Sequence, residues 1–125
     1  MFKGILKYDP TKEYYFEEGC YINELSNIEY DEAVSIVMAR VPMGVKTRRH
    51  RLIDTFERYV ILRGSGMVYV DNNPPEIVSK GDVVLFPPET VQSIENIGND
   101  DLVFLAICSP RFVKKNYEDV DNKEG

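Results

Sequence analysis

The stretch GVKTRRHRLIDTFERYVILRG, residues 44–64, decides the fold. Its second half contains the segment 58–62, whose β-branched and aromatic side chains favour a strand over a helix. Glycines at positions 64 and 66 then allow a tight reversal of the chain, and a second apolar segment, 66–70, follows at once. The stretch therefore predicts two strands joined as a β-hairpin.

On both sides of this hairpin the same pattern continues, with short apolar segments between turns rich in Gly, Pro, Asn and Asp. The spacing, together with the lack of a helical period, predicts an all-β sandwich or barrel. Segments such as 59–62 and 102–107 are apolar on both faces, which predicts that one face packs on a second subunit in a homodimer. We predict strands over 19–25, 33–41, 47–52, 58–62, 66–70, 76–78, 82–86, 90–96 and 102–109.

The two ends of the chain differ from this central part. Residues 1–18 carry several aromatic side chains and are expected to form an N-terminal arm with an extra strand, which could lie across a partner. Residues 113–125 are charged and nearly free of apolar side chains, so we expect a short helical turn and a loose C-terminal tail. The barrel itself is expected over 19–112.

The composition narrows the possible functions. The 125 residues carry a net charge of −6. Because nucleic-acid binding requires a basic face, we expect no nucleic-acid partner. No apolar run approaches the roughly 18 residues of a membrane-spanning helix, and charges and a proline interrupt the N-terminal residues before a secretory signal could form. With two cysteines there is neither a disulfide scaffold nor a zinc knuckle, so we expect a reducing, cytoplasmic location.

The deciding stretch also carries four residues at regular intervals. Gly44, His50, Glu57 and Gly64 are separated by five, six and six residues. This pattern resembles the first motif of the cupin superfamily, in which a glycine, five residues, His-x-His, three or four residues, a glutamate, six residues and a glycine follow one another. Leu52 stands where the family has its second histidine.

A second segment, GDVVLFPPETVQSIEN, begins at Gly81 and is similar to the second cupin motif. That motif is a glycine, five residues, Pro-x-Gly, two residues, a histidine, three residues and an asparagine. Pro87 and Asn96 match it, whereas Glu89 replaces the glycine and Gln92 replaces the histidine. Because glycine accepts a positive φ more readily than glutamate does, we expect a slightly different turn at position 89.

The resemblance implies a cupin-type double-stranded β-helix, also called a jelly-roll barrel, over 19–112. His50 and Leu52 point to the same face of an extended strand, because side chains alternate along it. A barrel of this type would bring Glu57 and Gln92 from neighbouring strands to face His50 at its mouth. We therefore expect a ligand site there.

His50, Glu57 and Gln92 offer an imidazole nitrogen, a carboxylate and an amide oxygen. Divalent ions such as Fe, Mn, Ni or Zn accept such donors. The alternative is a polar cluster that forms hydrogen bonds internally and binds no metal. Since His50 is the single histidine, a three-His zinc site or a two-His iron site cannot be built within one chain.

His50 and Glu57 are the candidate catalytic residues. With a metal ion, Glu57 or a bound water would move a proton, and without one His50 would act as acid and base. Arg48 is expected to share the face of His50 and bind a carboxylate or phosphate of a ligand, the alternative being ion pairs at a strand edge. Tyr59 is expected to share the face of Glu57. Its hydroxyl could donate a hydrogen bond to the ligand, or the residue could be an aromatic side chain of the core.

The resemblance implies a small polar ligand, sugar-like or carboxylate-like, bound in the barrel mouth. One interpretation is a metal-dependent isomerase or oxygenase-like enzyme, and the other is a metal-free binding or sensing barrel without catalysis. Cys108 lies in an apolar segment and is expected to pack as a small hydrophobic side chain. For Cys20 the sequence leaves open a bridge to Cys108 or a catalytic thiol near His50.

Overall fold

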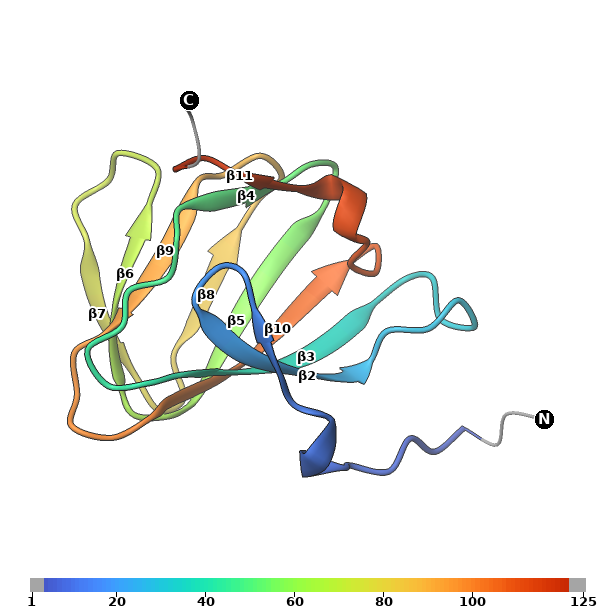
Figure 1. Cartoon of the computed structure of the whole chain (residues 1–125). Helices are drawn as coiled ribbons and strands as arrows, with labels where there is room; N and C mark the ends of the chain where they lie inside the picture. The colour runs from blue at the N-terminus through green and yellow to red at the C-terminus, as the bar shows by residue number, and fades with distance from the viewer. Residues whose placement is uncertain (1–3, 122–125) are drawn as a thin grey trace.

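The computed structural model describes residues 4–121 and consists of two β-sheets that face each other (Figure 1). The six-stranded sheet has the order β1-β2-β3-β10-β5-β8, and the five-stranded sheet has the order β11-β4-β9-β6-β7. This is the double-stranded β-helix that the sequence predicts. No helix among the described residues is long and apolar enough to cross a membrane. The strands are β1 (Tyr14–Phe16), β2 (Cys20–Ser26), β3 (Ser35–Val41), β4 (His50–Leu52), β5 (Phe56–Arg63), β6 (Ser65–Val70), β7 (Glu76–Ser79), β8 (Val83–Phe86), β9 (Gln92–Asn96), β10 (Leu102–Ser109) and β11 (Tyr117–Asp119).

The core between the sheets follows from the alternation of side chains along the strands. In β3, every second residue from Ser35 to Val41 is buried, while the residues between them lie half-buried on the outer face. Phe86 of β8 and Phe104 of β10 are the largest fully buried side chains, and both pack against the ring of Tyr59 on β5. Burial of each phenylalanine stabilises the fold by about 1.5–3 kcal/mol. These aromatic contacts make a rigid inner wall.

All nine predicted strands are present, and their ends lie within three residues of the predicted ones. The predicted β-hairpin is wrong, because the turn at Gly64 carries the chain from one sheet to the other: β5 pairs with β8 and β10, whereas β6 pairs with β7 and β9. The largest difference is in β4, which begins at His50 and not at residue 47. Residues 45–47 already bond to β9, with a bridge between Lys46 and Glu95. The backbone N–H of Arg48 donates instead to the carbonyl of Glu18 at 2.7 Å, so the pairing with β9 is interrupted and resumes at His50.

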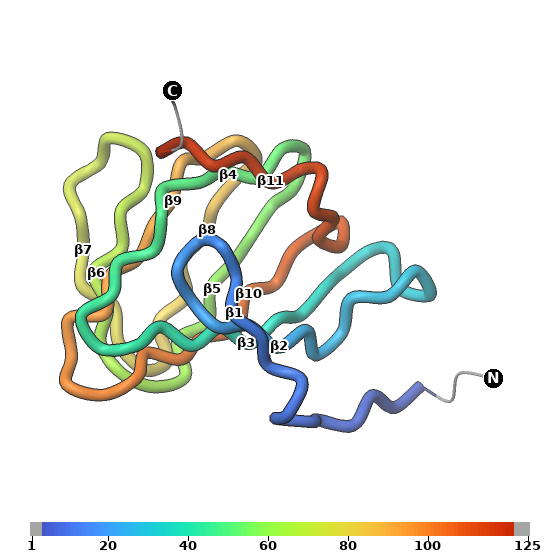
Figure 2. Tube along the Cα trace, viewed as in Figure 1, coloured from blue at the N-terminus to red at the C-terminus, as the bar shows by residue number. Residues whose placement is uncertain are grey.

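The ends of the chain add a strand to each sheet. β1 pairs antiparallel with β2, and β11 pairs antiparallel with β4, where both tubes run side by side in Figure 2. The prediction of a loose C-terminal tail is therefore wrong for Tyr117–Asp119, although the helical turn before it is present at Lys114–Asn116. Residues 1–3 of the arm and 122–125 of the tail lie outside the described residues.

Glu89, in the turn between β8 and β9, adopts the positive φ that glycine accepts most readily. Its φ is 65°, so the prediction of a different turn is wrong. The Glu89 carboxylate accepts the backbone N–H of Asp54 at 2.7 Å, and the Glu89 N–H donates to the carbonyl of Leu52 at 2.8 Å. These two hydrogen bonds offset the backbone strain and hold the turn against the end of β4, so that Gln92 begins β9 beside His50.

Gly64, between β5 and β6, is required by its surroundings. Its φ is 91°, and a Cβ added there would lie 2.8 Å from the carbonyl oxygen of Asp101, a backbone atom that cannot easily move aside. We expect Gly64→Ala to lower the free energy of unfolding by about 2–3 kcal/mol, measured by urea denaturation. The control is Gly44→Ala, where φ is 78° but nothing lies within 4 Å of the added Cβ. Its loss should be about 1 kcal/mol, and equal losses in the two variants would contradict the steric argument.

Candidate functional site

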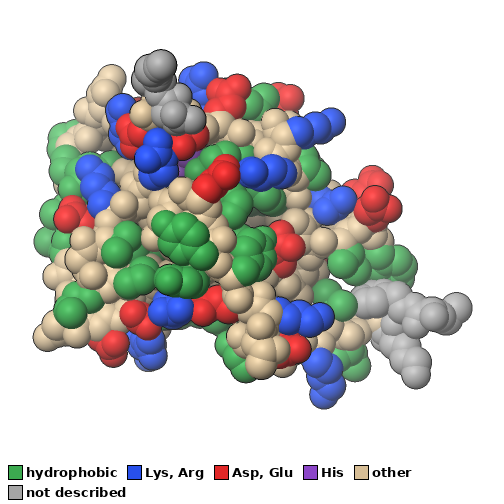
Figure 3. Space-filling view, viewed as in Figure 1, with side chains coloured by type: hydrophobic (Ala, Val, Ile, Leu, Met, Phe, Trp, Pro, Cys, Tyr) green, Lys and Arg blue, Asp and Glu red, His purple; other side chains and the backbone are tan. Residues whose placement is uncertain are grey.

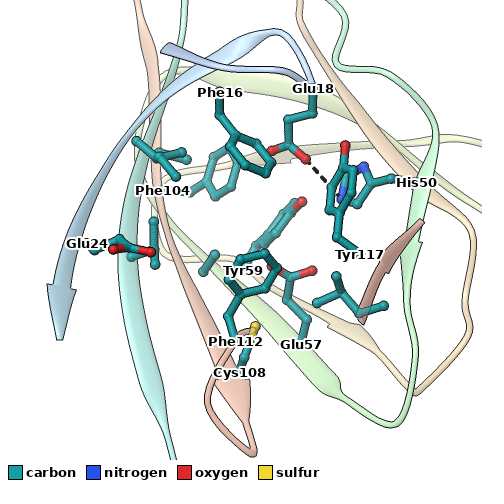
Figure 4. A pocket seen from close by; sticks show the side chains of 15 residues that line it. Phe16, Glu18, Glu24, His50, Glu57, Tyr59, Phe104, Cys108, Phe112 and Tyr117 are labelled. Carbon is teal, nitrogen blue, oxygen red and sulfur yellow. Dashed lines mark ion pairs between the residues drawn. The ribbon is translucent and has the colours of Figure 1, made fainter. Parts of the chain in front are cut away.

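A small cavity lies inside the barrel and is lined mostly by apolar and aromatic side chains (Figure 4). Its volume is about 50 Å³, room for about three to five water-sized groups. Such a space suits a ligand of only a few heavy atoms. The polar groups at the cavity surface belong to Glu18, Glu24, His50, Glu57, Tyr59, Cys108 and Tyr117.

The strand register brings the three predicted donors together. His50 on β4 lies directly opposite Gln92 on β9, so both side chains point to the same face of the five-stranded sheet. Glu57 comes from β5 in the other sheet, and Nε2 of Gln92 donates to its Oε1 at 2.7 Å. The three side chains therefore meet inside the barrel from three strands and both sheets.

His50 is 2 % exposed and is held from three sides. Its Nδ1 lies 2.9 Å from the carbonyl oxygen of Arg48, and because a carbonyl only accepts, Nδ1 must carry the proton. Nε2 then faces the cavity, 3.2 Å from Oε1 of Glu18. The ring of Tyr117 stacks on the imidazole, with centroids 5.1 Å apart and planes inclined by 18°. Nε2 is thus the atom of His50 that can exchange a proton with Glu18 or with a ligand.

Glu57 is a buried carboxyl group that favours its protonated form. Burial raises its pKa from 4.5 to about 7, and the negative charge of Glu18 adds to the rise. The charge of His50 and the hydrogen bonds from Gln92 and Cys108 act in the opposite direction. Glu57 therefore changes charge close to neutral pH, which is what a residue that both removes and returns protons requires.

Each of the two cavity carboxylates nearest to His50 also contacts a thiol. Sγ of Cys20 donates to Oε2 of Glu18 at 3.1 Å, and Cys108 forms a hydrogen bond with Glu57. Burial raises the pKa of both thiols, and the neighbouring carboxylates raise it further. Both cysteines are free, so no bridge joins Cys20 to Cys108, and protonated thiols are poor nucleophiles. Cys108 acts here as a hydrogen-bond donor as well as a packing residue.

The remaining predicted residues take different positions. Tyr59 lines the cavity, and burial raises the pKa of its phenol, so the hydroxyl keeps its proton and can donate to a ligand. Gln92 is not among the residues that line the cavity, and its Nε2 contacts the cavity residue Glu57. Its Oε1 is buried and, in the part of the chain that the structure describes, has no hydrogen-bond partner.

Arg48 does not share the face of His50, contrary to the prediction. Its guanidinium lies at the surface and pairs with Asp119, with Nε 2.7 Å from Oδ2. The prediction assumed strand alternation from residue 47 onward, but β4 begins at His50, and alternation does not extend to residue 48. The alternative interpretation, an ion pair at a strand edge, is the one that agrees with the structure.

The polar cavity residues Glu18, Glu24 and Tyr117 are absent from the sequence prediction of the site. Glu18 precedes β2 and looks like part of a turn, although its spacing from Cys20 and Ile22, which are also buried, is the period of one strand face. Tyr117 stands in a charged segment with no apolar neighbour at strand spacing, and nothing local indicates that it reaches the cavity.

The resemblance to cupins implies a divalent metal ion, and the arrangement of donors does not favour one. Among residues 4–121, no group of three His, Cys, Asp or Glu side chains is placed to hold a metal ion. Gln92 directs its amide N–H toward Glu57, and Leu52 lines the cavity where the family's second histidine would stand. His50, Glu57 and Gln92 converge, but they do not form a coordination set as they lie.

Comparisons with known proteins agree with the fold and its motifs. The model of the Cupin domain family matches residues 37–108. An uncharacterised protein of Methanocaldococcus jannaschii is 39 % identical over 114 residues, which is 90 % of each chain. An oxalate-binding protein of Thermotoga maritima is 36 % identical over 78 residues, 62 % of this chain and 64 % of the relative. The crystal structure of a predicted oxalate decarboxylase from Thermotoga maritima superposes with a TM-score of 0.67 and 30 % identity, over 73 % of this chain and 80 % of that one.

Proposed function

This chain belongs to the cupin family, and from that premise we propose that its cavity binds a small uncharged polar molecule and transfers protons on it, as an isomerase does. Cupins serve many chemistries, so the proposal rests on the residues of the cavity and not on the fold. The observation that carries it is the buried Glu57, with a pKa of about 7, beside the His50–Glu18 pair.

The polar groups suit the transfer of a proton next to a carbonyl group. Glu57 as carboxylate removes a proton from the carbon beside the carbonyl, while protonated His50 donates its Nε2 proton to the carbonyl oxygen and an enediol forms. Glu57 then returns its proton to the carbon that carried the carbonyl oxygen. His50 takes the proton from the hydroxyl group on the other carbon, and the isomerisation is complete. Tyr59 is placed to donate a hydrogen bond to an oxygen of the ligand. Such general acid–base catalysis contributes about 10²–10⁴-fold.

The charges around the cavity favour a neutral, sugar-like ligand over a carboxylate. Glu18, Glu24 and Glu57 face the cavity, His50 is the one basic side chain in its lining, and no lysine or arginine of residues 4–121 lines it. A dianion such as oxalate, for which the Thermotoga relative is named, would meet uncompensated negative charge here. The size of the cavity points to compounds of two or three carbons, such as glycolaldehyde and hydroxyacetone.

The test is the exchange of carbon-bound hydrogen for deuterium, which does not require the product to be known. Two- and three-carbon hydroxy-aldehydes and hydroxy-ketones are incubated with the protein in D₂O at pH 7 with a chelator, and their C–H signals are followed by NMR. We expect at least one compound to exchange faster with protein than without it. Saturable binding without exchange would instead support the metal-free binding barrel, and neither binding nor exchange would contradict the proposal.

A metal-dependent reaction is the second candidate, favoured by the unpartnered Oε1 of Gln92 and by the orientation of His50. An imidazole that donates from Nδ1 to a carbonyl presents Nε2 as many metal-bound histidines do. The exchange assay is therefore repeated with Fe(II), Mn(II), Ni(II) and Zn(II), with elemental analysis of the protein. Stoichiometric binding of one ion, with exchange only in its presence, would replace the metal-free proposal with this one.

We also propose a homodimer whose interface is the outer face of the six-stranded sheet. The outer face of the six-stranded sheet is largely apolar, although Arg40 and Arg58 also lie on it, and Val83 and Leu85 on its edge strand β8 are 56 % and 57 % exposed. A second copy is the partner that fits, because an apolar patch is complementary to itself about a twofold axis. We expect sedimentation equilibrium to give twice the 14.4 kDa of the chain and Leu85→Lys to give a monomer; a monomeric wild type would contradict this. The face also contains Ile36, Met38, Val60, Leu62, Val103, Leu105 and Ile107.

A further inference from the structure

The C-terminal segment 113–121, which we call the strap, lies along the edge of the five-stranded sheet beside β4 (Figure 1). It contains β11, a three-residue strand with a neighbour on one side only. Its Tyr117 lines the cavity and stacks on His50. The strap is therefore a surface element that also forms part of the wall of the site.

The chain is firmly anchored just before the strap. The backbone N–H of Phe112 donates to Oγ of Ser35 at 2.9 Å, and its carbonyl accepts from Nδ2 of Asn27 at 3.1 Å. Arg111 donates from its backbone to the carbonyl of Glu32 at 3.0 Å and from its guanidinium to Oδ1 of Asn27 at 2.8 Å. These contacts fix Phe112 against the six-stranded sheet, so the strap begins from a fixed point.

The strap is held by backbone pairing with β4, with further backbone hydrogen bonds at 2.8 and 2.9 Å on either side of β11, and by three ion pairs at the surface. Three arginines around β4 pair with three acids in the strap, each with Nε 2.7 Å from a carboxylate oxygen, and all six side chains are partly exposed. Basic and acidic side chains lie next to one another on that edge in Figure 3. Because exposed ion pairs are screened by salt, this part of the attachment depends on ionic strength. The pairs are Arg48–Asp119, Arg49–Asp121 and Arg51–Glu118.

Arg48 contacts both the strap and the site. Its side chain pairs with Asp119 of the strap, while its carbonyl oxygen accepts the Nδ1 proton of His50. Tyr117 of the strap covers one face of the His50 ring, and its hydroxyl is buried without a hydrogen-bond partner among the described residues. Release of the strap would thus uncover His50 and the cavity together.

We propose that the strap is the gate of the cavity: it opens about the anchor at Phe112 and moves Tyr117 away from His50, and the three arginine–carboxylate pairs reinforce the β11–β4 pairing that keeps it closed. Access to the cavity then depends on ionic strength. The inference concerns the site of the proposed function, but its test needs no ligand and no catalysis, so the two can fail separately.

The test measures how fast a thiol inside the cavity reacts. In a Cys20→Ser background Cys108 is the one remaining cysteine, and it lines the cavity. A small uncharged reagent, methyl methanethiosulfonate, modifies it only when the cavity is open, and mass spectrometry gives the rate. If each pair contributes about twofold, the variant R48Q/R49Q/R51Q should react about tenfold faster. The Cys20→Ser protein with its three arginines intact should also react faster when the salt is raised to 1 M NaCl, where the Debye length is about 3 Å.

The control variant is Arg40→Gln, which removes two ion pairs far from the strap in the chain, one of the same length, 2.7 Å to Glu13, and one of 3.4 Å to Asp101. Its rate should change less than twofold, and urea denaturation separates opening of the strap from global unfolding. An unchanged rate in the triple variant and in high salt would overturn the proposal, as would an equal increase in R40Q. If the triple variant does not fold, the salt series and the hydrogen exchange of the β11 amides in the unmodified chain decide in the same way.

Discussion

Replacing Glu57 by glutamine is expected to stabilise the protein at pH 8 while abolishing proton transfer in the cavity. The pKa of Glu57 rises from 4.5 to about 7 on folding. Well below pH 4.5 the Glu57 carboxyl is protonated in both the folded and the unfolded protein, so its burial does not lower the free energy of unfolding. As the pH rises toward 7, the unfolded chain ionises first, so the free energy of unfolding falls by about 3 kcal/mol in total.

Glutamine cannot ionise, and its amide oxygen can still accept from Gln92, so the variant avoids this loss. The difference in unfolding free energy between E57Q and wild type should grow from near zero at pH 4.5 to about 3 kcal/mol at pH 8. The same variant should lower the deuterium-exchange rate by about 10²–10⁴-fold. Urea denaturation across this pH range is the measurement, and parallel stability profiles of the two proteins would contradict a raised pKa of Glu57.

Replacing His50 by alanine is expected to lower the free energy of unfolding by about 3–5 kcal/mol. The side chains of His50 and Glu18 are 3 % and 11 % exposed, so loss of the imidazole leaves the Glu18 carboxylate buried without its partner. The stacking partner of Tyr117 is lost as well. Denaturation at pH 7 measures the change, and the deuterium-exchange assay should show no activity.

The double variant H50A/E18Q separates the charge from the packing. Because the glutamine introduced in place of Glu18 is neutral and can still accept from Cys20, the double variant should recover a large part of the stability that H50A loses. Equal instability of the single and double variants would show that packing alone explains the loss. Exchange activity that survives in H50A would contradict the role of His50 as a proton carrier.

Sequence patterns predicted the barrel because its signals are local. The turn at Gly64, the alternation around His50 and the strand-length segments each need only a few neighbouring residues to be read. The convergence of His50, Glu57 and Gln92 was also predictable, but only through the resemblance, since 35 residues separate Glu57 from the Gln92 that it contacts.

Other parts of the site depend on contacts between distant segments. Tyr117 reaches the cavity because β11 pairs with β4, and the Arg51–Glu118 contact between these two strands spans 67 residues of sequence. The charges around Tyr117 made the segment look like a tail. Arg48 was misplaced because a strand end cannot be located to within three residues from composition. The pairing of the two thiols with two carboxylates has no local signal at all.

The single histidine makes the central claim directly measurable. In the NMR spectrum, the Hε1 resonance of His50 reports the cavity alone, since no other imidazole exists in the chain. In the presence of a chelator, we predict that a small neutral hydroxy-ketone shifts this resonance saturably and that oxalate does not. A resonance that responds to oxalate but not to any neutral compound, or that responds only after a metal ion is added, would contradict the account.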